Sequence, residues 1–165
     1  LLQPMQRDLI GGIFFHQPIS THELCELLFG SVDRPASFHV AMSKMRKRGL
    51  NPALVGGGYR IDIPCDWAEF TDLVGPDPVA ADTTALAMAA AMISAPLFGA
   101  TPPAWTAGPL PAMRTYAAGV CRELAARHVD QPAAALGYAR QGLTVDPDNA
   151  ELADIIDTLS GQLSQ

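Results

Sequence analysis

Apolar residues recur every three or four positions in three short stretches within the first 48 positions of this 165-residue chain. That spacing places them on one face of a helix, so the sequence predicts helices at residues 6–17, 19–30 and 36–48. Pro18 stops the first helix. The residues expected to face the core are Leu9, Ile10, Ile13 and Phe14 in the first helix, Leu24, Leu27 and Leu28 in the second, and Phe38, Ala41, Met42 and Met45 in the third.

Residues at the helix ends support the same three helices. Ser20 or Thr21 is suited to cap the second helix, and Glu23 stands three residues after Ser20, which is the spacing of a capping box. Pro35 suits the first turn of the third helix, because proline lacks the backbone N–H that has no partner there. Gly49 follows the third helix and belongs to the residue type that most often ends one.

Three consecutive glycines at 56–58 separate two β-prone segments, ALV at 53–55 and YRIDI at 59–63. Glycine adopts the positive φ angles that tight turns need, so the sequence predicts a β-hairpin. Three short helices followed by a hairpin is the element order of a winged helix-turn-helix. In that fold the third helix enters the DNA major groove, and the hairpin reaches the backbone or the minor groove.

The second part of the chain predicts further helices joined by loops rich in Pro and Gly. The short helix expected first has Trp67, Phe70 and Leu73 or Val74 on one side. We expect the two tryptophans, Trp67 and Trp105, to act as core or interdomain anchors. The expected elements are a short helix at 65–75, an alanine-rich helix at 82–99 that ends near Pro96, a loop at 100–111 and a long helix at 112–128.

Residues 132–161 predict a final pair of helices. The spacing of several small residues here resembles the second helix of a tetratricopeptide repeat, in which small side chains let neighbouring helices pack closely. The pattern comprises Ala135, Ala139, Gly142, Leu143 and Pro147. Asp148 or Asn149 is suited to cap the last helix, whose inward-facing residues are Leu152, Ile155, Ile156 and Leu159. No second copy recurs at the repeat period, so we expect a degenerate bundle of this type.

The predicted fold is therefore mostly α. It consists of a winged helix-turn-helix with a short β-hairpin wing, followed by a tetratricopeptide-like α-helical bundle. The expected domains are residues 1–64, without the N-terminal sheet usual for such a winged helix, and residues 65–165.

Charge is distributed unevenly along the chain, whose formal net charge is −6. Residues 1–70 carry seven Lys/Arg and seven Asp/Glu, whereas residues 71–165 carry four and ten. A nucleic-acid partner would therefore meet only the first part, because the second would repel phosphate.

The overall composition points to a compact helix-rich chain, with 48% hydrophobic and 17% charged residues. No apolar run reaches the length of a membrane span. The three cysteines, Cys25, Cys65 and Cys121, lie far apart and suit a reduced, cytoplasmic setting better than a disulfide framework. Because residue 1 is leucine and no signal-peptide pattern opens the chain, we expect a piece of a longer protein.

A basic cluster and the glycine hairpin together carry a family resemblance. DRPASFHVAMSKMRKRGL, followed by ALVGGGYRI, resembles the output domain of OmpR/PhoB-type response regulators. The matching positions are Lys44, Met45, Arg46 and Lys47 in the helix and Gly56, Gly58, Tyr59 and Arg60 in the wing. The order of all the parts resembles the bacterial transcriptional activator domain family, which includes the Streptomyces antibiotic regulatory proteins.

The resemblance implies a DNA-binding transcriptional regulator. Lys44 and Lys47 would contact phosphates or bases, Ser37 and Ser43 would add hydrogen bonds, and Arg60 would support the wing against the DNA backbone. Double-stranded DNA is the expected partner of the first part. The helical part would contact a second copy of the chain, RNA polymerase or another protein.

A second hypothesis stays open, because three positions depart from the family. Val55 stands where a basic residue often precedes the wing glycines, and Ser43 and Ala36 stand where the helix often carries arginine. Both parts would then form a protein-interaction module that does not bind DNA. Such a module would lie at the C-terminus of a larger membrane-anchored or LysM-containing protein.

The sequence offers no coherent active site. The histidines His16, His22, His39 and His128 show no H-x-x-x-H or H-E-x-x-H spacing, and no C-x-x-C occurs. His22 and Glu26 are one helical turn apart, which favours a surface pair. The glycine triplet lacks the following Lys-Ser/Thr of a phosphate-binding loop. We therefore expect no catalytic residue, metal, cofactor or small-molecule substrate.

Overall fold

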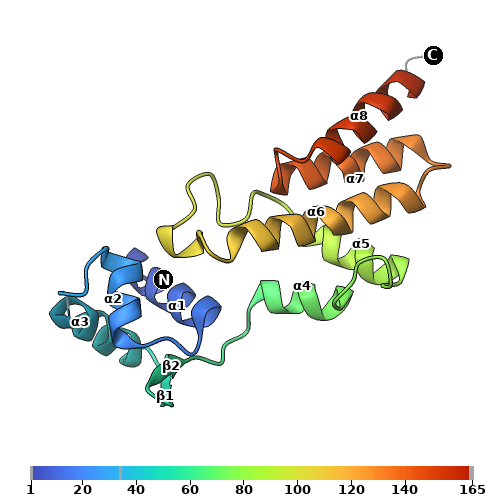
Figure 1. Cartoon of the computed structure of the whole chain (residues 1–165). Coiled ribbons are helices and arrows are strands. Elements are labelled where there is room, and N and C mark those ends of the chain that lie inside the picture. Colours follow the sequence, from blue (N-terminus) through green and yellow to red (C-terminus); the bar gives the residue numbers. More distant parts are fainter. Residues whose placement is uncertain (1, 34, 164–165) are drawn as a thin grey trace. The chain divides into compact units, whose positions relative to one another are not determined.

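The computed structural model describes residues 2–33 and 35–163. Within them the chain is mostly helical, with eight α-helices, one short 3-10 helix and one two-stranded antiparallel sheet (Figure 1). No helix in this described part is long and apolar enough to cross a membrane. The chain forms two compact units: unit 1 comprises residues 1–63 and 102–109, and unit 2 comprises residues 64–101 and 110–165.

Unit 1 contains three helices, the hairpin and a short helical turn. They are α1 (Pro4–His16), α2 (Thr21–Phe29), α3 (Pro35–Arg46), β1 (Ala53–Val55), β2 (Gly58–Arg60) and η1 (Ala104–Thr106). β1 pairs antiparallel with β2. On the other edge of β2, Ile19 forms an isolated bridge with Tyr59, in which Ile19 N donates to Tyr59 O at 3.2 Å and Tyr59 N donates to Ile19 O at 2.7 Å.

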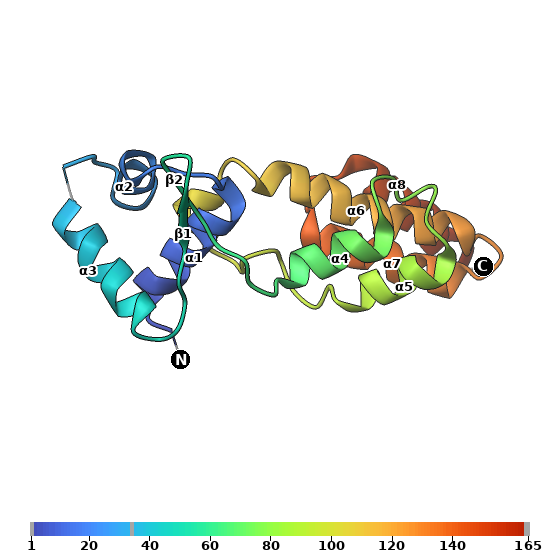
Figure 2. The same ribbon diagram turned by 90° about the horizontal axis from the view of Figure 1, so that it is seen from below.

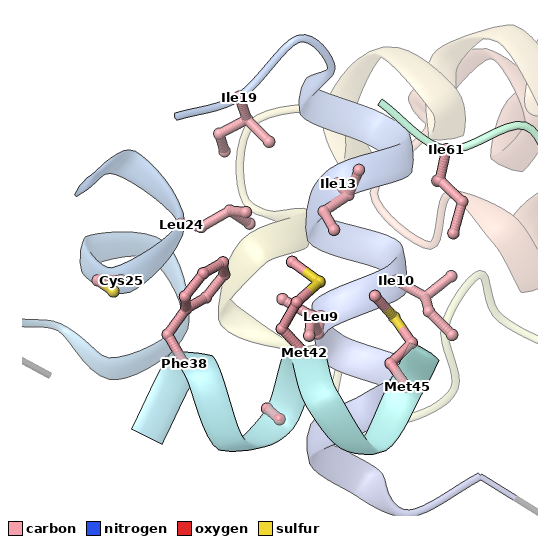
Figure 3. Packing of buried hydrophobic residues seen from close by; sticks show 11 residues of the cluster. Leu9, Ile10, Ile13, Ile19, Leu24, Cys25, Phe38, Met42, Met45 and Ile61 are labelled. Carbon is pink, nitrogen blue, oxygen red and sulfur yellow. The ribbon is translucent and has the colours of Figure 1, made fainter. Parts of the chain in front are cut away.

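The core of unit 1 lies among its three helices and the start of the segment after β2 (Figure 3). All four residues predicted to form the apolar stripe of α3 are buried, as are Leu9, Ile10, Ile13 and Leu24. Phe14, Leu27 and Leu28 are only partly buried and pack around this cluster. The helical spacing therefore predicted the centre of the core correctly.

Local hydrogen bonds decide two of the helix ends. Ser20, not Thr21, caps α2: its hydroxyl accepts from Glu23 N at 3.2 Å, and Glu23 Oε2 accepts from Ser20 N at 2.8 Å. α3 ends at Arg46, two residues before the expected end. Gly49, with φ +83°, closes it because Gly49 N donates to Arg46 O at 2.9 Å.

The hairpin is shorter than the sequence predicted. Gly56 and Gly57, with φ of +59° and +84°, form a two-residue turn, whereas Gly58 belongs to β2. A Cβ on Gly58 would lie 3.0 Å from Ile19 N, a tight backbone contact that favours glycine at this strand position. Ile61 lies outside β2, and its N–H donates to Gln17 Oε1 at 2.9 Å instead of to a neighbouring strand.

In the described residues of unit 2, every secondary-structure element is a helix, and loops join the helices. Its helices are α4 (Asp66–Val74), α5 (Thr83–Ala91), α6 (Leu110–Arg127), α7 (Pro132–Val145) and α8 (Ala150–Leu163). α6, α7 and α8 lie side by side in both views (Figures 1 and 2). Asn149 caps α8, since its Oδ1 accepts from Leu152 N at 3.2 Å. Of the expected inward-facing residues of α8, Leu152 and Leu159 are buried, and Ile155 and Ile156 are partly so.

The predicted end of the alanine-rich helix near Pro96 is wrong, because α5 already ends at Ala91. Gln141 of α7 binds the chain where it leaves α5. Its Nε2 donates to Ala90 O, in the last turn of the helix, at 2.7 Å and to Ile93 O, beyond the helix, at 2.8 Å. Ile93 itself is buried in the core of unit 2.

The segment at residues 102–109, called the Trp105 segment below, belongs to unit 1, whereas the sequence placed it in the helical domain that follows residue 64. The indole of Trp105 stacks on Phe15, with ring centroids 5.6 Å apart. Its Nε1 donates to Asp8 Oδ1 at 3.2 Å, and its backbone oxygen lies 2.8 Å from His16 Nε2. These contacts hold a stretch that the sequence assigned to a loop against α1.

Candidate nucleic-acid interface

Helix α3 has one buried and one exposed face. Phe38, Ala41, Met42 and Met45 form the buried face, and the residues at the intervening positions are exposed. The structure thereby places four of the five predicted DNA-binding residues together on one helix surface. These are Ser37, Ser43, Lys44 and Lys47, and the last lies in the turn that follows the helix.

Three basic side chains at the end of α3 form no ion pair with any described residue. Among the residues that the structure describes, no carboxylate forms an ion pair with Lys44, Arg46 or Lys47. The cations stand at the C-terminal end of α3, where they also interact favourably with the helix dipole. The result is a positive patch on an exposed helix end, which is the electrostatic form of a phosphate-binding surface.

A shallow groove runs from this patch toward the N-terminal turn of α1. Lys44, Lys47 and Arg48 line it together with Met5 and Asp8. The carboxylate of Asp8 is held by the indole N–H of Trp105, in which Asp8 Oδ1 is the acceptor. A second groove, between the start of α1 and α3, is lined by apolar and polar side chains that include Met5, Gln6, Val40 and Lys44.

The fifth predicted residue, Arg60, lies on the hairpin rather than on α3. It is exposed and pairs across the sheet with Ala53. Within the described ranges Arg60 forms no ion pair with a carboxylate. The neighbouring strand β1 presents Leu54 and Val55 to solvent, at 66% and 49% exposure, so the wing is apolar where a basic side chain was expected from the resemblance.

Sequence reasoning did not include Val40 among the site residues. Val40 is 54% exposed and lies at the centre of the outer face of α3. The signal was present in the sequence: a large apolar residue stands alone among serines and lysines, out of phase with the buried stripe.

The titratable groups away from this surface show structural roles. Burial raises the pKa of the Cys121 thiol to about 12 and also raises the pKa of Cys25, so neither is a ready thiolate near neutral pH. Burial, with a smaller effect of Asp77, raises the pKa of Tyr116, whose hydroxyl donates to Gly75 O. In the described parts of the chain, no group of three or more His, Cys, Asp or Glu is arranged to hold a metal ion.

Comparison with known proteins adds no assignment. No family model, no curated protein and no solved structure matches this chain. The surface of α3 and the hairpin beside the same core are therefore the features that bear on function.

Proposed function

We propose that this chain is a DNA-binding transcriptional regulator whose unit 1 is a winged helix with α3 as the recognition helix. The observation that carries the proposal is the outer face of α3. It combines exposed hydroxyls at Ser37 and Ser43 with the cations Lys44 and Lys47, which have no carboxylate partner in the described chain. Phosphate contacts supply most of the affinity of such surfaces, and base contacts supply the specificity.

The order of elements in unit 1 supports the winged-helix part of the proposal. Between α1 and α2, Ile19 forms the bridge that adds a short third segment to the hairpin sheet. α2 and α3 then precede β1 and β2. Pairing of Ile19 with β2 holds the hairpin against the helices, so that Arg60 has a fixed support from which to reach the DNA backbone.

Unit 2 supports a different task, because an acidic helical surface repels DNA. We propose that it is a helical domain of the bacterial transcriptional activator type, contacting a second copy of the chain, RNA polymerase or another protein. Buried small residues support the likeness to a tetratricopeptide repeat. Ala139 is fully buried, and a Cβ on Gly142 would lie 2.6 Å from Leu152 Cδ1, so α7 and α8 approach closely at Gly142. A regulator of transcription would act in the cytoplasm.

The test is fluorescence anisotropy with a mixed-sequence duplex at several salt concentrations. About four phosphate contacts predict a log–log slope of affinity against salt near −3 to −4. Lys44→Ala/Lys47→Ala should weaken binding and reduce the magnitude of that slope by roughly two, since two phosphate contacts are lost.

A matched control is Arg122→Ala/Arg140→Ala, which removes the same charge from exposed positions in unit 2. The control should keep the slope of the unaltered protein. Equal losses in both variants would show that net charge alone, and not the surface of α3, determines binding. No binding even at about 20 mM salt would exclude DNA as the partner of this chain.

The exposed apolar strand favours a second candidate function. Leu54 and Val55 on β1 suit contact with a protein better than contact with phosphate. In this reading the chain is a protein-interaction module that does not bind DNA, within a larger membrane- or cell-wall-associated protein. Loss of a protein complex on Leu54→Ser/Val55→Ser, in a chain without salt-dependent DNA binding, would favour this alternative.

A further inference from the structure

Val40 occupies the centre of the surface that we propose to face DNA. The exposed residues Ser37, Val40 and Lys44 of α3, and Lys47 in the turn that follows, stand at spacings of three or four, which aligns them along the outer face. Ala36 and Ser43 flank Val40 at the same spacings and are also exposed. On the helix itself Val40 thus has small or polar neighbours. Met5 and Gln6 of α1 line the groove beside it, yet Val40 stays 54% exposed.

The chemistry of valine restricts what it can recognise on DNA. Its side chain neither donates nor accepts a hydrogen bond, so it cannot read the polar edges of guanine, adenine or cytosine in the major groove. The apolar group displayed there is the C5 methyl of thymine. Valine is also stiff at χ1 within a helix, so holding it in place against a methyl group costs little side-chain entropy.

The position of Val40 fits such a contact. It lies before Lys44 and Lys47 on α3, and residues in the N-terminal part of a recognition helix are those that reach base edges. The cations nearer the helix end can meet phosphates at the same time. We infer that Val40 is a specificity-determining residue that contacts a thymine methyl group in the major groove, an inference that rests on the proposed function.

Deoxyuridine provides the test, because it differs from thymidine only by the missing methyl group. A duplex enriched on this protein from a randomised pool would be re-synthesised with each thymine replaced singly by deoxyuridine, and affinities measured by anisotropy. Deoxyuridine at one position, or at either of two adjacent positions, should weaken binding by about fourfold. That factor corresponds to one buried methyl group. Val40→Ala should abolish this sensitivity at those positions.

Val32→Ala is the matched control, since Val32 is also an exposed valine of unit 1 but precedes α3. It should keep the sensitivity to deoxyuridine. Val40→Ala is not expected to unfold the protein, because alanine has a higher helix propensity than valine at an exposed position.

The outcomes separate the two proposals. Salt-dependent binding that no deoxyuridine substitution weakens, or a Val40→Ala variant that keeps the sensitivity, would overturn the role of Val40 and leave the DNA-binding function standing. Failure of the whole pool to bind in a salt-dependent way would overturn both.

Discussion

Gly11 lies in α1 at a point where no side chain fits. A Cβ built there would lie 2.3 Å from Cζ2 and 2.5 Å from Cη2 of Trp105, both in the rigid indole ring. The ring is itself held by stacking on Phe15 and by the hydrogen bond to Asp8. The backbone φ of Gly11 is one that any residue can adopt, so it is the contact with Trp105, and not the backbone conformation, that favours glycine at this position.

Gly11→Ala should consequently lower the free energy of unfolding by about 1–3 kcal/mol, as overpacking of a tight contact does. Urea unfolding followed by circular dichroism measures it. Gly137→Ala is the control: nothing lies within 4 Å of a Cβ there, and alanine in an exposed helix should stabilise by about 0.5–1 kcal/mol. Equal effects of the two changes would contradict the close contact with Trp105.

Whether an element could be predicted from sequence depended on where its determinants lie. The stripe of α3 and the cap at Ser20 follow from residues three or four positions apart, so local spacing was enough. The end of α5 is bonded by Gln141, which is 51 residues from Ala90, and no local pattern carries that contact. The Trp105 segment packs on α1 through contacts 89 and 97 residues apart in sequence, so it resembled an ordinary loop.

The candidate site divides in the same way. The grouping of Lys44 with Lys47 follows from helical spacing alone. The position of Val40 outside the buried stripe follows from the same spacing, whereas the exposure of Leu54 and Val55 on β1 became evident only in the folded chain.

At the scale of the element, the capping box of α2 should make part of the stability of the protein depend on pH. Hydrogen bonds from the Ser20 side chain and then from its backbone N–H hold the pKa of the Glu23 carboxyl below its usual value. A group with a lowered folded pKa contributes stability that is present above its unfolded pKa and is lost as pH falls through the folded one. The contribution should therefore be present above about pH 5 and disappear on further acidification.

Titration of Glu23 followed by NMR measures the shift directly. Ser20→Ala removes the hydroxyl, which is the largest cause, and should move the pKa of Glu23 back toward its ordinary value while the backbone donor of residue 20 remains. An unchanged pKa in the variant would show that the capping hydroxyl does not stabilise the carboxylate.

At the scale of the whole molecule, the chain passes between its two units three times, after residues 63, 101 and 109. Each unit also contains one tryptophan packed on aromatic neighbours. Trp105 stacks on Phe15 in unit 1, and Trp67 stacks on Phe70 in unit 2, with ring centroids 5.3 Å apart. The two residues therefore provide a matched pair for asking whether each unit depends on its own core.

Trp105→Ala should weaken unit 1, although residue 105 lies between two helices of unit 2 in sequence. Loss of a buried tryptophan costs about 3 kcal/mol, so amide hydrogen exchange in α1 should accelerate by roughly a hundredfold while α7 stays protected. Trp67→Ala should give the opposite pattern of amide hydrogen exchange, with faster exchange in α4 and little change in α1. If either variant accelerated exchange equally in both units, the stabilities of the units would be coupled, and the Trp105 segment would have to be understood as part of a single cooperative structure.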